Sequence, residues 1–489
     1  MKILYTFLIF SLSLIHSYGQ TLGVSWSSPL NVGTGSLHNN IYPRITVTSN
    51  DVPLVVWEDN SPAKVYSSRK TGAAFSAPLS LNPTGISPFV ANWAGAEVSS
   101  SGDTVFAVFT SMPVLSGNAY AVRSIDGGIS YSDTVRIDQD SARIPSFPSV
   151  IVMPGGNPIV SYMIADDGSM LNTEYVVSKS TDGGTTFLPS VMPANTGNVC
   201  ECCPASMAIT GNDFALLYRN DISNLRNIWS SFSSDGGASF SMSAEIDTTD
   251  WYTSTCPSSG PSAVIIGDSL VYSWMSDATG DARIYIGTMN INDQLFGQQR
   301  QIYPAGTSTQ NFPVIAGKGD TLGLVWQGYN GSFQDVLFSW SVTGVAGLGL
   351  KIDTLTKSTS GHQSRPDLTF NNGKFHLVYS DNVGTQVKYL EGDFAMNVSV
   401  NEINAVPDVS LTSMNINGSI EVQLNSTHES TAEILIVNAM GQQIQKTAID
   451  INTGANHYSL QHSMSPGIYF ILVEANDGKV YNNKVVVAK

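Results

Sequence analysis

The chain has 489 residues, of which 42% are hydrophobic and only 13% are charged, and its formal net charge is −16. This length leaves room for several ordinary domains, or for one large repeat fold with an appendage. The acidic balance disfavours nucleic acid and anionic membrane surfaces as partners.

The N-terminus has the pattern of a secretory signal peptide over residues 1–19. Lys2 supplies the positive charge, residues 3–15 are apolar, and small residues precede Gln20. The apolar run is too short for a stable membrane span, and no later stretch is long and apolar enough for one. We therefore expect a secreted protein without a transmembrane segment, whose mature chain begins at Gln20.

Short apolar runs that end in an aromatic residue recur every 52 to 56 residues. The seven aromatics are Trp57, Phe109, Tyr162, Tyr218, Trp274, Trp326 and Tyr379. A strand that starts with proline precedes most of them, and a proline at the first residue of a strand costs no ladder hydrogen bond. Turn residues separate the runs, and no helical period is present. The pattern predicts an all-β fold with a seven-bladed β-propeller over residues 20–396; six blades are the alternative.

The two ends of this region are expected to meet. The last repeat, from Pro366 to about Phe394, has three strands instead of four. The segment Trp26-Ser27-Ser28-Pro29-Leu30 is similar to Phe75-Ser76-Ala77-Pro78-Leu79, the outermost strand of the first full repeat. The N-terminal segment would then supply the missing strand, which hides sheet edges that otherwise template aggregation.

A second motif, S-x-D-G-G-x-[S/T]-aromatic, occurs around Asp126, Asp182 and Asp235. It predicts a tight turn in which the carboxylate accepts backbone N–H groups and glycine adopts a positive φ. The closing aromatic can pack between neighbouring sheets. The motif resembles the Asp-box (BNR) repeat of sialidase-like β-propellers. This resemblance implies that the three aspartates are structural and lie on the outer rim, away from the channel.

The same resemblance raises the possibility of an enzyme. Sialidases use three arginines for the substrate carboxylate, a Tyr–Glu pair as nucleophile and an aspartate as acid and base. Their R-I-P motif should open the first blade, but here the order is Tyr42-Pro43-Arg44-Ile45, and Arg143-Ile144-Pro145 precedes the third repeat. We expect a binding protein for glycan or protein ligands at one channel mouth. A sialidase-like glycoside hydrolase is one alternative, and a structural or adhesive surface protein is the other.

The four cysteines of the chain are grouped. Cys200, Cys202 and Cys203 precede the innermost strand of the fourth repeat, and Cys256 precedes that of the fifth. Because these blades are neighbours, all four sulfurs can meet. Three interpretations remain open: a disulfide from Cys256 to one of the others, a soft-metal site for Cu(I) or Zn(II), and a redox or free-thiol site. The C-x-C-C spacing differs from the C-x₂-C of zinc knuckles.

Polar and aromatic residues near the strand ends complete the predicted ligand-binding site at the channel mouth. Arg219, Asp221, Arg226 and Trp251 lie close to the cysteines in sequence. His362 and Arg365 come next to Arg44 and His38 once the ring closes, where they would form a polar corner.

The chain ends in a separate small unit. After a polar linker at residues 397–408, residues 409–489 contain alternating strands, including 434–442, 465–473 and 484–489. These segments resemble the C-terminal sorting domain of cargo of the type IX secretion system of the Bacteroidetes. The resemblance implies an Ig-like β-sandwich of about seven strands. It also implies recognition by the outer-membrane translocon and delivery to the cell surface or the medium, often followed by removal of the domain.

Overall fold

The structure is a computed structural model of the chain. It describes residues 21–33, 40–140, 142–166, 169–193, 198–302, 309–357, 359–382, 385–397, 409–416, 418–438, 442–475 and 480–487. The predicted signal peptide, His38 and residues 398–408 of the predicted linker lie outside the described residues.

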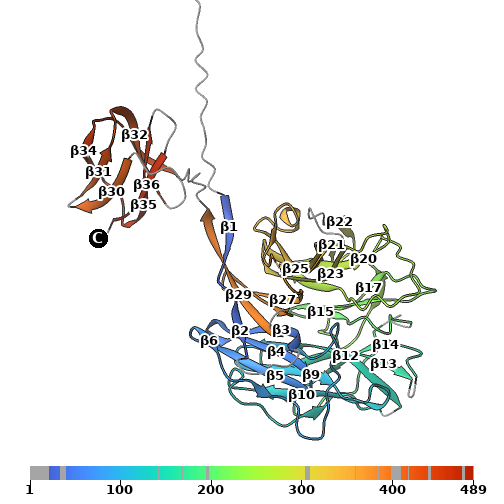
Figure 1. Cartoon of the computed structure of the whole chain (residues 1–489). Helices are drawn as coiled ribbons and strands as arrows, with labels where there is room; N and C mark the ends of the chain where they lie inside the picture. The colour runs from blue at the N-terminus through green and yellow to red at the C-terminus, as the bar shows by residue number, and fades with distance from the viewer. Residues whose placement is uncertain are drawn as a thin grey trace, which may run out of the picture. The chain divides into compact units, whose positions relative to one another are not determined.

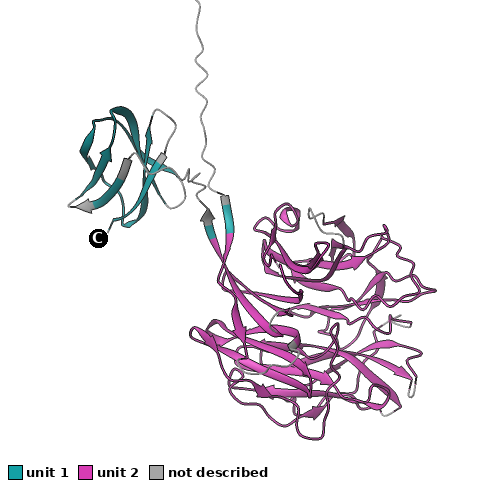
Figure 2. Cartoon of the chain, viewed as in Figure 1, with its two compact units in different colours: residues 1–23, 395–489 teal, residues 24–394 magenta. Residues whose placement is uncertain are grey.

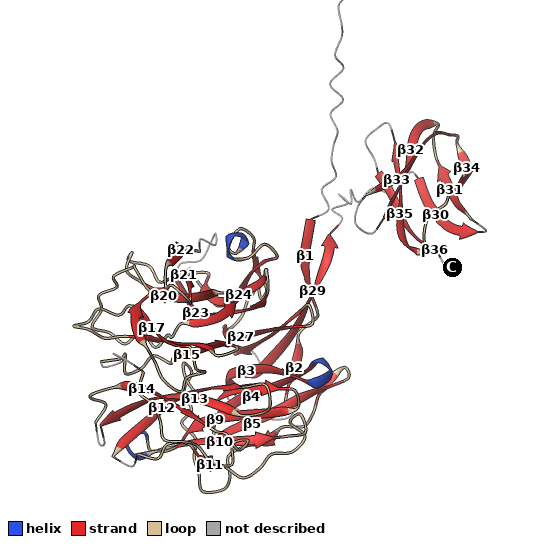
Figure 3. Cartoon of the chain, turned by 180° about the vertical axis from the view of Figure 1, so that it is seen from behind, coloured by secondary structure: helices blue, strands red, loops and turns tan. Residues whose placement is uncertain are grey.

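Two compact units divide the chain (Figure 2). Residues 24–394 form the larger unit, and residues 395–489 belong to the smaller one. Both are all-β, and the regular structure other than strands consists, in the described residues, of the single 3₁₀ turns Ser49–Asp51, Val114–Ser116 and Val345–Gly347 (Figure 3). No helix in the part of the chain that the structure describes has the length and apolarity to cross a membrane.

The described residues of the larger unit form seven antiparallel sheets, and the first six are each built from consecutive strands (Figure 1). The first sheet contains β3 (Asn40–Thr48), β4 (Val52–Asn60), β5 (Ala63–Thr71), β6 (Ala74–Phe75) and β7 (Leu79–Ser80). The second contains β8 (Glu97–Ser101), β9 (Thr104–Thr110), β10 (Ala119–Ser124) and β11 (Val135–Arg136). The third contains β12 (Arg143–Val152), β13 (Pro158–Asp166) and β14 (Glu174–Lys179). The fourth contains β15 (Ser206–Thr210), β16 (Asp213–Arg219), β17 (Ile228–Ser233) and β18 (Met242–Glu245).

The remaining three sheets follow the same plan. The fifth contains β19 (Ser262–Ile266), β20 (Ser269–Ser276), β21 (Arg283–Asn290) and β22 (Phe296–Gln301). The sixth contains β23 (Thr309–Lys318), β24 (Thr321–Tyr329), β25 (Gln334–Ser341) and β26 (Ile352–Thr354). The seventh contains β27 (Gln363–Asn371), β28 (Lys374–Asp381) and β29 (Gln386–Asn397). The first strand of each sheet contacts the first strand of the next, and β27 contacts β3, so these contacts run through all seven sheets and return to the start.

The recurring aromatics lie in the second strand of each sheet. All seven are between 0 and 4% exposed, from Phe109, Tyr218, Trp274 and Trp326 at the lower limit to Tyr379 at the upper. These strands are buried almost throughout, because each sheet packs between two others and both of its faces are covered. The period of 52 to 56 residues therefore marks one sheet after another.

In four of the seven sheets, the first strand contains a β-bulge with an X-Pro step in it. The register shifts at Ile41/Arg44, Ser146/Ser149, Asn311/Val314 and Ser364/Asp367. The residue before each proline has a positive φ: 52° at Tyr42, 50° at Phe147, 55° at Phe312 and 54° at Arg365. The expectation that these prolines begin their strands is wrong. A bulge also tolerates proline, since its residues leave the hydrogen-bond ladder, and it redirects the neighbouring side chain.

The N-terminal segment completes the seventh sheet, as the sequence predicts. β1 (Thr21–Trp26) and β2 (Leu30–Val32) both pair with β29. Leu30 lies opposite Tyr389, and Val32 lies opposite Val387. Val32 is fully buried in a cluster with Trp57 of the first sheet and Tyr389 of the seventh. The start of the chain therefore joins the first and last sheets.

The Asp-Gly-Gly turns have the predicted local geometry. Asp182 accepts the Thr186 N–H (2.9 Å) and the Thr186 hydroxyl (2.7 Å), and Ser180 Oγ accepts the Gly184 N–H (2.8 Å). The φ angles of Gly183 and Gly184 are 70° and 81°. The Thr186 hydrogen bonds lower the pKa of Asp182 to about 2. Equivalent hydrogen bonds surround Asp126 and Asp235.

The smaller unit contains two sheets in the described residues. One consists of β30 (Val409–Ile416), β31 (Ser419–Ser426) and β34 (Gly454–Gln461), and the other of β33 (Gln443–Ile451), β32 (Ser430–Asn438), β35 (Gly467–Ala475) and β36 (Val480–Val487). Their buried residues, among them Val422, Ile434, Ile436 and Ile471, form one core. Burial alternates along β31 and β35, as expected for strands with one covered face. The unit is therefore a two-sheet sandwich.

We expect Val32→Asp to destabilise the larger unit by at least about 3 kcal/mol, since it removes a buried side chain and buries a carboxylate without a partner. The matched control is Asn31→Ser, because Asn31 is exposed on the same strand. Thermal unfolding of both variants measures the difference. Equal melting temperatures would contradict a structural role for the β2–β29 pairing.

Candidate functional site

A cavity of about 180 Å³ lies where the first strands of the sheets meet. Every sheet contributes to its lining, either from its first strand or from the residues just before that strand. Representative lining residues, one from each sheet, are Arg44, Glu97, Ser149, Ser206, Ser262, Val314 and Asp367. The cavity is smaller than the 300–1,000 Å³ or so typical of drug-sized ligands, so it suits a small polar molecule or the end of a larger one.

Arg44, Glu97 and Tyr42 form a paired charged cluster in this cavity. Arg44 Nε and the Tyr42 hydroxyl both donate to Glu97 Oε1 at 2.8 Å. The Arg44 guanidinium also lies 3.7 Å from the centre of the Tyr42 ring. Burial alone would lower the pKa of Arg44, but Glu97, Tyr42 and Asp367 together outweigh burial, so the pKa is raised. The charge of Arg44 is thus compensated within the protein.

Arg365 is the second cation of the cavity, and no carboxylate among the described residues forms an ion pair with it. Its guanidinium lies 3.4 Å from the centre of the Phe312 ring. Among the described residues, Nη1 is buried without a hydrogen-bond partner. Burial is the main cause that lowers the pKa of Arg365 to about 9; Tyr42 opposes this shift, and the charge of Arg44 adds to it. The shift reflects a cation held away from water without a counter-charge.

Asp367 supplies the carboxylate whose charge state changes most readily. Its Oδ2 accepts the backbone N–H of Ile45 at 2.8 Å, across the β27–β3 contact. Burial raises the pKa of Asp367 to about 6, against the opposing effect of Arg44. The charged residues on the lining are Arg44, Arg365, Glu97 and Asp367. The lining therefore has no net charge between about pH 6 and pH 9, the pKa values of Asp367 and Arg365, and it gains one positive charge when Asp367 is protonated.

Of the predicted ligand-binding residues, Arg44 and Arg365 line the cavity, and ligand binding by them stays a prediction. The sequence prediction missed Tyr42, Glu97, Phe312 and Asp367, although three of these flank the proline of an X-Pro bulge. The X-Pro step is therefore the signal for Tyr42, Phe312 and Asp367, whereas Glu97 has no such signal in the sequence.

Arg219 does not belong to this cavity. It is fully buried, and its guanidinium donates to the carbonyls of Ser259 (3.2 Å), Met275 (2.7 Å) and Arg226. It also lies 5.1 Å from the ring of Trp251. Burial lowers its pKa to about 10. Because its donors are used on backbone carbonyls of the fourth and fifth sheets and the segments before them, Arg219 and Trp251 join these sheets instead of binding a ligand.

Asp221, Arg226 and His362 also lie outside the cavity lining. Arg226 forms ion pairs with Asp221 (3.1 Å) and Glu201 (3.2 Å). His362 Nδ1 accepts the backbone N–H of Gln334 at 3.1 Å. These side chains have protein partners, and the structure places them in loops around the sheets.

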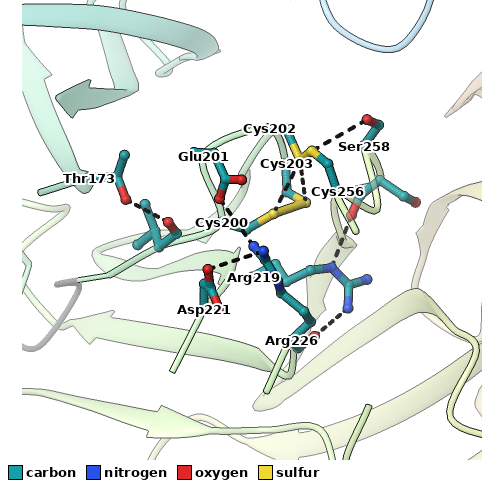
Figure 4. Close-up of a disulfide and its surroundings, with 12 residues drawn as sticks. Thr173, Cys200, Glu201, Cys202, Cys203, Arg219, Asp221, Arg226, Cys256 and Ser258 are labelled. Atoms are coloured by element: carbon teal, nitrogen blue, oxygen red, sulfur yellow. Dashed lines mark hydrogen bonds and ion pairs between the residues drawn. A yellow bond between two sulfur atoms is a disulfide. The ribbon is translucent and has the colours of Figure 1, made fainter. Parts of the chain in front are cut away.

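The four cysteines come together between the fourth and fifth sheets (Figure 4). The structure contains one disulfide between Cys200 and Cys203 and another between Cys202 and Cys256. Cys202 Sγ lies 3.5 Å from Cys200 Sγ and 3.9 Å from Cys203 Sγ. In a reduced form, the sulfurs of Cys200, Cys202 and Cys203 would be close enough to share one ion. A copper or zinc site stays a prediction.

Residues 416–488 match the family model of the secretion system C-terminal sorting domain. This domain marks proteins that the type IX system exports to the cell surface or the extracellular space, and it implies an interaction with that system. A search of curated proteins found no match.

Solved structures that are similar to this chain include a protein of unknown function from Dyadobacter fermentans, with 13% identity, a TM-score of 0.47, and coverage of 65% of this chain and 98% of that one. A mutant Trypanosoma rangeli sialidase with trans-sialidase activity has 13% identity and a TM-score of 0.46, over 96% and 89% of the two chains. A Penicillium chrysogenum α-L-arabinanase has 16% identity and a TM-score of 0.42, over 62% and 94%. Likeness at this level carries no argument about activity.

We expect Arg219→Ala to lower the free energy of unfolding by about 3 kcal/mol or more, because buried carbonyl oxygens lose their donors. Denaturant unfolding measures the effect. The control is Lys318→Ala, since Lys318 is an exposed residue at the end of β23. An Arg219→Ala variant as stable as the control would contradict a structural role for Arg219.

Proposed function

Because the chain carries a type IX sorting domain and is exported, we propose that it is an extracellular binding protein for the acidic end of a glycan. In this proposal the seven sheets are the blades of a seven-bladed β-propeller, and the cavity at their first strands is the ligand site. The closed order of contacts between first strands and the pairing of β2 with β29 support this blade number. The turns at Asp126, Asp182 and Asp235 then serve as Asp boxes.

The observation that carries the proposal is the uncompensated guanidinium of Arg365. A planar guanidinium donates to a carboxylate through two parallel hydrogen bonds, and it does so most strongly where water is excluded. Arg365 is held by Phe312 in a cavity whose other arginine already has a carboxylate partner. A carboxylate on the ligand would give Nη1 the acceptor that it lacks within the described protein.

The size and lining of the cavity favour the terminal residue of a saccharide. Tyr42, Trp93 and Phe312 add aromatic surface to the lining, next to the charged groups. Aromatic walls with a few fixed polar groups are typical of small-molecule sites. The volume of about 180 Å³ admits a terminal residue but no long internal segment. An acidic sugar at the end of a glycan meets both requirements.

A sialidase-like hydrolase is the second candidate, and the hydrogen bond between Tyr42 and Glu97 favours it. Such enzymes use a Tyr–Glu pair as nucleophile. Burial, however, raises the pKa of Tyr42 well above its ordinary value, although Arg44 acts in the opposite direction. The phenol would therefore resist the loss of its proton, and only two arginines line the cavity. We accordingly favour binding over hydrolysis.

We expect Arg365→Gln to weaken binding of an acidic oligosaccharide by about 10- to 100-fold, the loss that corresponds to one charge-assisted hydrogen-bonding group. A glycan array identifies the ligand, and calorimetry measures its affinity. Arg136→Gln is the control, because Arg136 lies on an outer strand. Equal affinities for the wild type and Arg365→Gln would contradict the proposal. Release of sialic acid from a sialoside, abolished by Tyr42→Phe, would establish the hydrolase instead.

The affinity for an acidic ligand should also depend on pH through Asp367. Protonation of Asp367 near pH 6 removes a negative charge that repels the ligand carboxylate, which itself stays ionised above about pH 4. We expect binding to tighten by up to about tenfold between pH 7.5 and pH 5. Asp367→Asn should bind tightly at both values, since Asn can still accept the Ile45 N–H. A wild-type affinity that falls on acidification would contradict this assignment.

A further inference from the structure

None of the four cysteines lines the ligand cavity, although Cys203 directly precedes the lining residue Pro204, and nothing in the proposed function uses the cluster. We propose that it is a thiol–disulfide exchange centre that reacts with extracellular thiols, with Cys256 as the sulfur at which they enter. Three features support this: the unequal spans of the two disulfides, the contact between them, and the exposure of one sulfur only.

The two disulfides constrain the chain to very different degrees. Cys202 and Cys256 are 54 residues apart, and their bridge joins the segments before the fourth and fifth sheets. Cys200 and Cys203 are only three residues apart. Because the loss of loop entropy in the unfolded chain grows with the length of the closed loop, the short bridge stabilises the fold much less. The Cys202–Cys256 disulfide alone would be enough to join the two sheets, so that role does not explain the Cys200–Cys203 disulfide.

The Cys200–Cys203 disulfide instead lies where it can react with a thiolate from the Cys202–Cys256 disulfide. Cys202 Sγ is 3.5 Å from Cys200 Sγ and 3.9 Å from Cys203 Sγ, so all three lie in one group (Figure 4). Exchange requires a thiolate to reach a disulfide sulfur through a mixed-disulfide step. A thiolate on Cys202 would already lie beside the Cys200–Cys203 disulfide, without a movement of the backbone.

Access from solvent is restricted to one end of the cluster. Cys256 is exposed, whereas Cys200 and Cys203 are fully buried and Cys202 is 8% exposed. Ser258 Oγ donates to Cys256 Sγ at 3.7 Å. The nearby Glu201 carboxylate, which would oppose a thiolate, is paired with Arg226 at 3.2 Å. An external thiol therefore meets Cys256 first, beside an acidic group that is already neutralised.

The exchange proceeds in three balanced steps. An external thiolate, having lost its proton to water, attacks Cys256 Sγ; a mixed disulfide forms, the Cys202–Cys256 bond breaks, and the electron pair stays on Cys202. The Cys202 thiolate then attacks Cys200 Sγ, which forms a Cys200–Cys202 disulfide and leaves Cys203 as a thiolate that takes up a proton. A second external thiolate attacks the external sulfur of the mixed disulfide and releases Cys256, which also takes up a proton. Two thiols are oxidised to one disulfide, and one protein disulfide is reduced to two thiols.

Limited reaction of the full-length protein with cysteine, followed by acid quenching, alkylation and peptide mass mapping, tests this scheme. We expect the cysteine adduct on Cys256, the alkyl group on Cys203, and a new disulfide between Cys200 and Cys202. In a Cys200→Ser/Cys203→Ser double variant, the Cys202 thiolate has no second disulfide to attack. We therefore expect the alkyl group on Cys202 in this variant.

A Cys256→Ser variant gives a second test, in which the position of the free thiol is mapped without the double variant. It leaves one thiol beside one disulfide, and we expect this thiol to be distributed over Cys200, Cys202 and Cys203. A thiol confined to Cys202 would overturn the proposal, as would wild-type protein in which only Cys202 and Cys256 react while the Cys200–Cys203 disulfide stays intact. Four reduced cysteines with about one copper or zinc ion per chain in the purified protein would overturn it in favour of a metal site.

Discussion

Pairing of β2 with β29 brings the two ends of the larger unit together, and the candidate site depends on that pairing. It places β27 beside β3, so that Asp367 Oδ2 accepts the N–H of Ile45, 322 residues away in the chain. Val32 fixes the junction, because it is buried between Trp57 of the first sheet and Tyr389 of the seventh. Without this closure Arg44 and Arg365 would lie at opposite ends of an open row of sheets. The hydrophobic contact at one edge therefore determines the electrostatics of the cavity.

Within the closed unit, the X-Pro bulges decide which side chains line the cavity. A bulky residue with a positive φ is unusual, and such conformations are concentrated at functional sites. At Tyr42, Phe312 and Arg365 the bulge places a large side chain on the cavity lining. The result is one compensated arginine, one uncompensated arginine and one carboxylate with a raised pKa. Burial of the aromatic residues stabilises the sheets, whereas the positive-φ residues in the first strands place the charged and aromatic side chains of the cavity.

The sequence predicts those features that arise from local or periodic causes. The recurring aromatics mark the sheets because each is buried in a second strand, and the turn at Asp182 follows from hydrogen bonds within a few residues. The cysteines also meet as their spacing suggests. Arg219 lies outside the cavity, contrary to the prediction from the sequence. Its position near a strand end does not reveal that its guanidinium donates to backbone carbonyls. The Glu97 partner of Arg44 is 53 residues away, and no local pattern indicates that pairing.

We propose that Arg365 binds a ligand carboxylate in the cavity at the first strands. A crystal structure of the protein with an oligosaccharide that ends in a uronic or sialic acid tests it most directly. We expect the terminal carboxylate about 2.7–2.9 Å from the Arg365 guanidinium, with the sugar against the aromatic lining. A ligand bound at any other surface, with the cavity holding only water, would contradict it.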